Sequence, residues 1–112
     1  MGSHLTRRLI ELGSNLHILV KKTSDLWRLN DIPKDSFKVW RLDLCNIEEL
    51  LNCVQKIRPW KTFHLAALVN ADRNPALLNT MIDINLKGTI NLISALSKSD
   101  SGLLVNFGTC EE

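Results

Sequence analysis

The sequence contains no tyrosine, only three cysteines, and no apolar run near the roughly 20 residues needed to cross a bilayer. The cysteine spacing fits neither a disulfide framework nor a CxxC pair, which favours a reducing, cytoplasmic setting. Lysine and arginine total 14 against 12 acidic residues, so a net charge of +2 gives no pull toward nucleic acid or an anionic membrane. We therefore expect a soluble protein with no nucleic-acid or membrane partner.

The length limits the architecture. A chain of 112 residues, 45% of them hydrophobic and 23% charged, has the composition of an ordinary globular domain. It buries somewhat less than about 70% of its unfolded surface, enough for one modest core. We expect one domain over residues 1–112.

Helical and strand periodicities alternate along the chain. The expected elements are helix 3–12, strand 16–20, helix 25–29, strand 37–42, helix 47–57, strand 62–69, helix 74–98 and strand 103–107. Gly13 stands where the first helix would stop in a left-handed cap. The apolar strands 16–20 and 103–107 are expected to be buried on both faces, and the order of elements is typical of a parallel α/β sheet covered by helices.

The helix over residues 74–98 is expected to pack along one apolar face. That face consists of Leu78, Ile82, Leu86, Ile90, Ile93 and Leu96. Cys53 is expected on the buried side of its helix and chemically inert, and His64 is expected to be a hydrogen-bonded core residue. The three tryptophans are expected to pack, and no spacing of His, Cys, Asp and Glu predicts a metal site.

Ligands of an open parallel sheet bind at the carboxyl ends of the strands. Lys21 and Lys22 lie at such an end and could reach a ribose or its phosphate, and Asp43 could accept a hydrogen bond from an exocyclic amine. The small side chains of Ala66 and Ala67 would let a flat ligand lie against the backbone. Each residue also has an ordinary role: Asp43 or Asn46 as a helix cap, the alanines in close packing, and the lysines at a solvated strand end.

Together these segments resemble the extended short-chain dehydrogenase/reductase family of NAD(P)-dependent nucleotide-sugar epimerases and dehydratases. The matching segments are residues 2–9, 41–44, 64–67, 85–92 and 107–112. Residues 2–9 are similar to the end of the family's glycine-rich loop, and residues 41–44 to its adenine contact. Residues 64–67 are similar to the strand end that lies against the cofactor. Residues 85–92 are similar to the helix whose asparagine organises the active site, and residues 107–112 to the Ser/Thr strand end. The resemblance implies a partial Rossmann-like doubly wound parallel sheet that lacks the first strand, with NAD or NADP as cofactor.

The same resemblance implies roles for individual residues. The cofactor-binding set is Gly2, Lys21, Lys22, Asp43, Leu44, Leu65, Ala66, Ala67, Leu68 and Asn85. Thr109 takes the place of the Ser/Thr that hydrogen-bonds the sugar hydroxyl, and Glu111 that of the glutamate which removes a proton in 4,6-dehydratases. Cys110 stands where an Asp or Ser is usual, which weakens the dehydratase interpretation because a thiol is a poor proton donor.

Two lysines at the end of strand 16–20 favour NADP. NAD-preferring relatives place an acidic residue in this region, where it binds the ribose hydroxyls. A carboxylate would repel a 2′-phosphate, whereas Lys21 or Lys22 would attract it.

The resemblance implies a nucleotide-sugar substrate for a longer enzyme, of which this chain would be an internal piece. The family uses a tyrosine as general base, and this chain has none, so we expect it to be inactive alone. Without a first strand, strands 16–20 and 63–68 either pair directly or leave apolar edges that invite homodimers or edge-strand association. A non-catalytic dinucleotide-sensing or protein-interaction module is the alternative.

Overall fold

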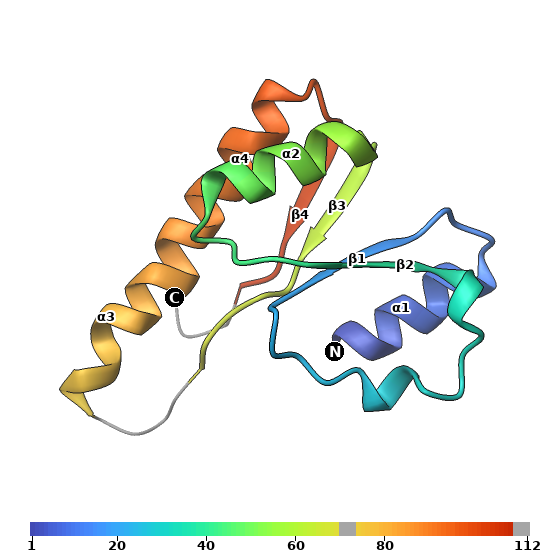
Figure 1. Cartoon of the computed structure of the whole chain (residues 1–112), viewed down its shortest axis with the longest axis horizontal. Helices are drawn as coiled ribbons and strands as arrows, with labels where there is room; N and C mark the ends of the chain where they lie inside the picture. Colours follow the sequence, from blue (N-terminus) through green and yellow to red (C-terminus); the bar gives the residue numbers. More distant parts are fainter. Residues whose placement is uncertain (70–73, 109–112) are drawn as a thin grey trace. The chain divides into compact units, whose positions relative to one another are not determined.

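The computed structural model describes residues 1–69 and 74–108 (Figure 1). The chain divides into two compact units, Met1–Asp43 and Leu44–Glu112. In the described residues, no helix has the length and apolar character that a membrane crossing requires.

The first unit pairs two parallel strands and carries one full helix. Its elements are α1 (Gly2–Glu11), β1 (His17–Val20), the 3₁₀ turns η1 (Trp27–Leu29) and η2 (Lys34–Ser36), and β2 (Lys38–Arg41). β1 and β2 run parallel, with His17 opposite Lys38. α1 ends as predicted, because Gly13 has a φ of 74° and the N–H of Ser14 reaches back to the Leu9 carbonyl at 3.1 Å.

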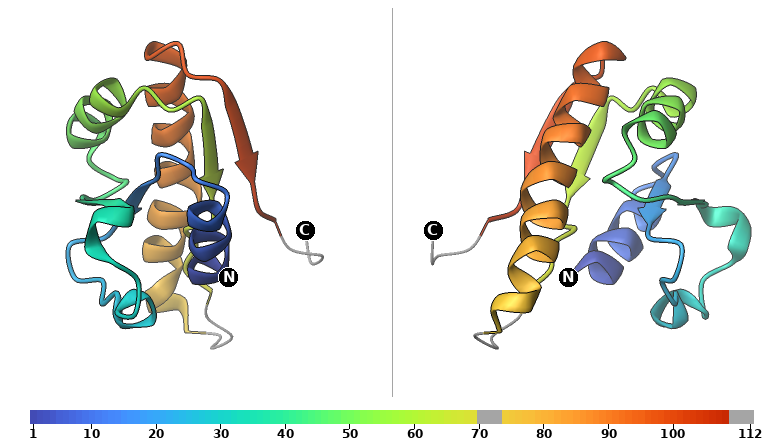
Figure 2. Two further views of the ribbon diagram at one scale, coloured as in Figure 1. Left: turned by 90° about the vertical axis from the view of Figure 1, so that its right-hand side faces the viewer. Right: turned by 60° about the vertical axis from the view of Figure 1, so that its left-hand side comes forward.

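The second unit contains the other parallel pair and the longer helices. Its elements are α2 (Ile47–Ile57), β3 (Lys61–His64), η3 (Pro75–Leu77), α3 (Leu78–Met81), the π turn η4 (Ile82–Lys87), α4 (Gly88–Lys98) and β4 (Leu103–Asn106). β3 and β4 run parallel, with His64 opposite Asn106, and both views of Figure 2 show α4 beside them. The core lies between α2 and α4, where Leu50 and Ala95 are fully buried.

The cap of α2 settles an alternative left open by the sequence. The side chain of Asn46 accepts a hydrogen bond from the N–H of Glu49 at 3.2 Å, so Asn46 rather than Asp43 is the N-cap. At the other end Arg58 adopts a left-handed conformation, with φ 49°, and Pro59 follows. The predicted bounds of this helix are confirmed.

The strands are less covered than the sequence suggested. Each of the four described strands pairs with one partner, β1 with β2 and β3 with β4. The prediction of strands buried on both faces is wrong: β1 is half-buried, and Leu103 in β4 is 56% exposed. A two-stranded sheet leaves each strand an open edge, which accounts for this exposure.

The prediction of which face packs in the helical segment after residue 74 is also wrong. Leu78, Ile82, Leu86, Ile90 and Ile93 are between 46% and 57% exposed, and only Leu96 of that set is buried. α4 instead buries Gly88, Leu92, Ala95 and Leu96. This second stripe has the same helical spacing and includes small residues, which let neighbouring backbone approach closely. A Cβ on Gly88 would lie 3.1 Å from the Cβ of Leu44.

Candidate functional site

The segment that follows β3 contains four of the predicted cofactor contacts. β3 ends at His64, and Leu65, Ala66, Ala67 and Leu68 continue beyond its carboxyl end. Ala66 and Ala67 are exposed, whereas Leu65 and Leu68 are half-buried. The segment therefore presents two small side chains outward, as a surface for a flat ligand requires.

Asn85 holds the far end of this segment. Its Oδ1 accepts a hydrogen bond from the N–H of Leu68 at 2.7 Å, and its Nδ2 donates to the Leu68 carbonyl at 3.0 Å. The side-chain amide thus satisfies both backbone groups of Leu68 as a neighbouring strand would. The structure brings Asn85 and Leu68 together. The sequence analysis placed both residues in one site, but it did not predict this contact.

Asn85 lies in the π turn η4, and π turns inside helices often occur at functional sites. The hydroxyl of Thr89 donates to the Asn85 carbonyl at 2.7 Å. The same oxygen lies 2.9 Å from Nε2 of His64, whose ring is buried and whose pKa burial lowers. The prediction that His64 is a hydrogen-bonded core histidine is confirmed.

Leu44 is fixed beside the start of α4. Its carbonyl accepts a hydrogen bond from Asn91 Nδ2 at 2.9 Å, and its side chain approaches Gly88. Next to it, the thiol of Cys45 lies 3.3 Å from the Asp83 carbonyl in the π turn. The turn between β2 and α2 is therefore attached to the same helix that carries Asn85.

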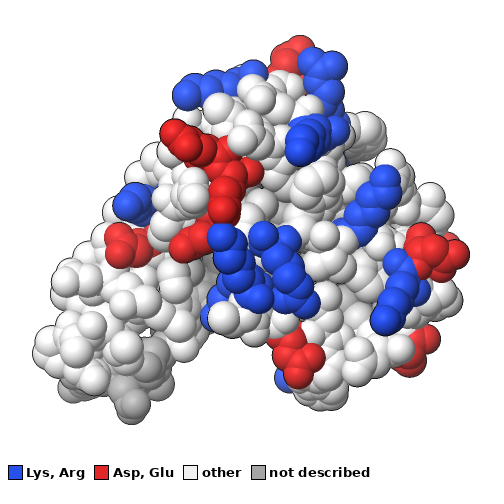
Figure 3. Space-filling view, in the orientation of Figure 1, with Lys and Arg blue, Asp and Glu red and all other residues white. Residues whose placement is uncertain are grey.

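In the first unit, Lys21 and Lys22 follow β1 and are exposed, as predicted. Arg41, the last residue of β2, donates from Nη1 to the Ser24 carbonyl at 2.7 Å and to the Lys22 carbonyl at 3.4 Å. The turn after β1 therefore carries two lysines, and the guanidinium of Arg41 from β2 is bonded to the backbone of the same turn. Figure 3 shows basic and acidic side chains together on one face, in keeping with the small net charge.

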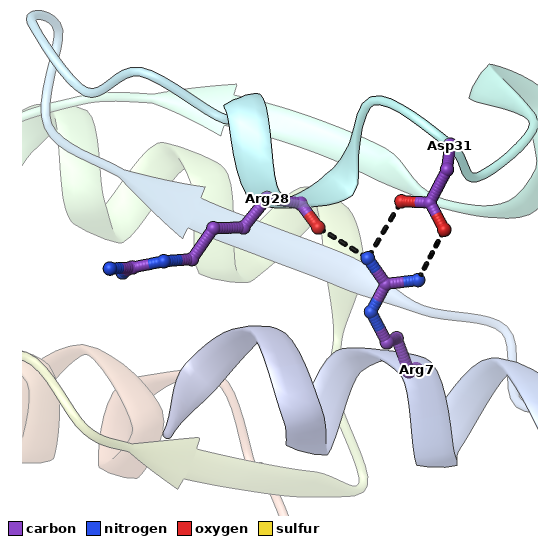
Figure 4. A network of polar contacts seen from close by, with 3 residues as sticks. All are labelled: Arg7, Arg28 and Asp31. Atoms are coloured by element: carbon purple, nitrogen blue, oxygen red, sulfur yellow. Dashed lines mark hydrogen bonds and ion pairs between the residues drawn. The ribbon is translucent and has the colours of Figure 1, made fainter.

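Gly2 begins α1, and the exposed Asp43 follows β2. The same helix holds the loop before β2 through a contact that sequence reasoning missed. Arg7 forms a two-pronged ion pair with Asp31, at 2.8 and 2.7 Å, and also donates to the Arg28 carbonyl (Figure 4). The guanidinium lowers the pKa of the Asp31 carboxyl through this hydrogen bonding. The partners are 24 residues apart, and no spacing in the sequence signals such a pair.

Two of the three tryptophans do not pack as expected. Trp40 is half-buried, and its Nε1 donates to Nδ1 of His17 at 3.0 Å. Trp27 and Trp60 are 59% and 70% exposed, each with a cation over its ring from the next residue in the chain, 4.8 and 4.7 Å from the ring centre. A neighbouring cation, rather than core burial, accompanies these two rings.

The remaining predictions concern Cys53, the carboxyl-terminal residues 109–111 and metal binding. Cys53 is buried, and burial raises the pKa of its thiol to about 11, which agrees with an inert residue. Thr109, Cys110 and Glu111 lie outside the described residues, so their proposed roles stay predictions. Within residues 1–69 and 74–108 no cluster of three potential ligands could hold a metal ion.

A family model described as the NAD dependent epimerase/dehydratase family matches residues 1–112. The chain is 29% identical to a dTDP-glucose 4,6-dehydratase of Neisseria meningitidis serogroup B, over 85% of this chain and 28% of that protein. It is 27% identical to tetraketide alpha-pyrone reductase 2 of Arabidopsis thaliana, over 92% of this chain and 33% of that protein. It spans about a third of each curated relative's length.

A solved structure of UDP-glucose 4-epimerase from Thermus thermophilus, in complex with NAD, matches with a TM-score of 0.79. The match has 24% identity and covers 92% of this chain and 32% of that one. At this identity the likeness concerns the fold. The predicted fold class, a partial Rossmann-like parallel α/β arrangement, is confirmed, and the described elements open with the helix α1.

Proposed function

Because the chain belongs to the NAD-dependent epimerase/dehydratase family, we propose that it supplies part of the dinucleotide site of an enzyme acting on nucleotide sugars. One observation carries the proposal. The segment from Leu65 to Leu68 leaves the carboxyl end of a parallel strand with Ala66 and Ala67 outward, and Asn85 holds its far end. Ligands of such sheets bind at this end of the strands.

Each unit carries residues that would suit one part of a nicotinamide dinucleotide. Ala66 and Ala67 leave room for a flat group beside the backbone, and Asp43 has an exposed carboxylate that suits an exocyclic amine. Gly2 opens α1, so the backbone N–H groups of its first turn suit a phosphate. When bound, the nicotinamide would accept a hydride from a sugar carbon, and the role of this chain's residues would be to hold and orient it.

The turn after β1 favours NADP over NAD. Lys21, Lys22 and Arg41 place positive charge there, and Arg41 donates to the carbonyls of Lys22 and Ser24. A 2′-phosphate would gain from these charges, whereas a ribose hydroxyl would gain little. Replacing Lys21 and Lys22 together by glutamate should reduce the preference for NADP.

The substrate of the whole enzyme would be a nucleotide sugar. This rests on the dTDP-glucose 4,6-dehydratase and UDP-glucose 4-epimerase among the similar proteins. Thr109 would bind the sugar hydroxyl, and Glu111 would serve as a base in a dehydratase. A chain without tyrosine lacks the family's general base, so we expect this polypeptide to bind cofactor without oxidising a sugar. We place it in the cytoplasm, because the number and spacing of its three cysteines fit no disulfide framework.

Self-association is a further part of the proposal. In both strand pairs each described strand has one open edge, and the exposed apolar face defined by Leu78, Ile82, Leu86, Ile90 and Ile93 adds hydrophobic surface. Open edges and apolar patches both promote association. Light scattering coupled to size-exclusion chromatography should give a mass above 12.7 kDa that falls on dilution. A concentration-independent monomer would contradict this part.

Calorimetric titration of the chain with NADP⁺ and NAD⁺ tests the cofactor proposal. We expect NADP⁺ to bind more tightly, by about 2- to 5-fold, the equivalent of roughly one favourable exposed charge contact. The Ala66→Trp variant should lose binding of both cofactors, because a large side chain would cover the outward surface. The matched control is Ala76→Trp, in the exposed turn η3. Equal binding by Ala66→Trp and the unsubstituted chain would refute the assignment, and no binding at all would remove the dinucleotide-sensing alternative as well.

A further inference from the structure

Four hydrogen bonds close a ring around the segment proposed to contact the cofactor. The ring starts at His64, follows the chain through Leu65, Ala66 and Ala67 to Leu68, and crosses to Asn85 through two bonds of 2.7 and 3.0 Å. From the Asn85 carbonyl it passes to the Thr89 hydroxyl at 2.7 Å, and from there back to His64 Nε2 at 2.9 Å. Both ends of the segment are therefore tied to the same helical turn.

The direction of the bonds fixes the proton on His64. A carbonyl oxygen only accepts, so the single hydroxyl proton of Thr89 goes to the Asn85 carbonyl. The Thr89 oxygen must then accept from the imidazole, and Nε2 of His64 must carry hydrogen. The ring thus requires the Nε2–H tautomer of a neutral His64.

We propose that His64 and Thr89 are positioning residues, which hold the segment from Leu65 to Leu68 in the conformation that receives the dinucleotide. This inference rests on the proposed function. His64 is 6% exposed and Thr89 half-buried, so neither presents its polar group outward to a ligand. Their effect on binding would pass through Asn85, whose π turn they brace, and through the backbone of Leu68.

The alternative is that the His64–Thr89 bond only satisfies a buried imidazole. In that case its loss would lower stability but leave the segment and its ligand unaffected. The two interpretations differ at Leu68, which lies four residues beyond His64 and contacts neither its ring nor the Thr89 hydroxyl through the bonds described. A change at the Leu68 amide on loss of the hydroxyl is therefore the signature of positioning.

The test compares Thr89→Val, which removes the hydroxyl and keeps the shape, with Thr89→Ser, which keeps the hydroxyl. Thr80→Val, in the exposed part of α3, is the matched control. Long-range ¹H–¹⁵N spectra should show His64 as the Nε2–H tautomer in the unsubstituted chain, Thr89→Ser and Thr80→Val. Thr89→Val should lose this preference, and its Leu68 amide should exchange with solvent about 3- to 10-fold faster, as expected for one lost hydrogen bond.

NADP⁺ affinity, measured by calorimetry on the same variants, completes the test. We expect Thr89→Val to bind about 3- to 10-fold more weakly and Thr89→Ser to recover the binding. An Nδ1–H tautomer in the unsubstituted chain would overturn the ring, even if Thr89→Val failed to fold. Unchanged Leu68 exchange and unchanged affinity in Thr89→Val would overturn positioning. If the unsubstituted chain bound no cofactor, the proposed function would fail, while the tautomer and amide exchange would still decide whether the ring holds the segment.

Discussion

Gly102 precedes β4 at the place where that strand meets β3, and we predict that Gly102→Ala weakens this junction. A Cβ at this position would lie 2.2 Å from the carbonyl oxygen of Trp60. That atom belongs to the backbone, so it cannot rotate away as a side chain would. The same carbonyl accepts the N–H of Leu103 at 2.9 Å, and the N–H of Gly102 lies 3.4 Å from the Pro59 carbonyl.

The magnitude follows from these contacts. Overpacking costs about 1–3 kcal/mol, and displacement of the first bonds of the strand pair costs about 1 kcal/mol more. The lower entropy of the unfolded alanine chain offsets about 0.4–1 kcal/mol. We expect Gly102→Ala to lower the free energy of unfolding by about 1–3.5 kcal/mol.

Urea denaturation followed by circular dichroism measures this change directly. Gly2→Ala is the matched control, because a Cβ there would meet nothing within 4 Å. We expect the control to lie within about 0.5 kcal/mol of the unsubstituted chain. If Gly102→Ala were as stable as the control, the close approach of residue 102 to Trp60, and with it the register of β3 and β4, would be refuted.

Three further predictions concern titratable groups. Iodoacetamide should modify Cys53 only slowly at pH 8, because a thiol of pKa about 11 is then roughly 0.1% ionised. Peptide mass mapping should show that this labelling becomes rapid when urea unfolds the chain. Arg7 lowers the folded pKa of Asp31, so the stabilisation from this ion pair is present above the unfolded pKa near 3.9 and is lost as pH falls through the lower folded pKa. Asp31→Asn should therefore reduce the acid sensitivity of the melting temperature. An unchanged pH profile would contradict a stabilising Arg7–Asp31 ion pair. The folded pKa of His64 is also lowered, so stability should fall as pH drops below about 6.5, and a His64→Gln variant that kept the full decline would contradict this origin.

Local signals in the sequence predicted much of the fold because their causes are local. Gly13 ends α1 because glycine adopts positive φ without strain, and Asn46 caps α2 through its own neighbouring backbone. The single apolar stripe of α2 identified Cys53 as buried. In each case the residues that decide the structure lie within one helical turn.

The errors arose where two local patterns competed or where a partner was distant. α4 offers two apolar stripes, and the one containing Gly88 and Ala95 is buried because small residues permit close packing, a preference that periodicity alone does not reveal. The exposure of Trp60 depends on an open surface beside β3, which a strand pattern cannot predict.

At the candidate site, too, the sequence predicted which residues come together but not the long-range contacts that hold them. Strand ends and resemblance placed Ala66, Leu68 and Asn85 in one site, but the bonds that connect Asn85 to Leu68 span 17 residues. The role of Thr89 depends on its contact with His64, which spans 25 residues and which no periodicity in the sequence indicates. Contacts of this kind follow from the packed structure rather than from spacing.

We propose that a nicotinamide dinucleotide binds this chain at the carboxyl ends of its strands. An ¹H–¹⁵N correlation spectrum of the labelled chain, titrated with NADP⁺ to roughly 10 mM, tests it residue by residue. We predict saturable shifts of the amides from Leu65 to Leu68 and of Lys21 and Lys22. An unchanged spectrum, or shifts confined to the exposed apolar face around Ile82 and Ile90, would contradict dinucleotide binding at these strand ends.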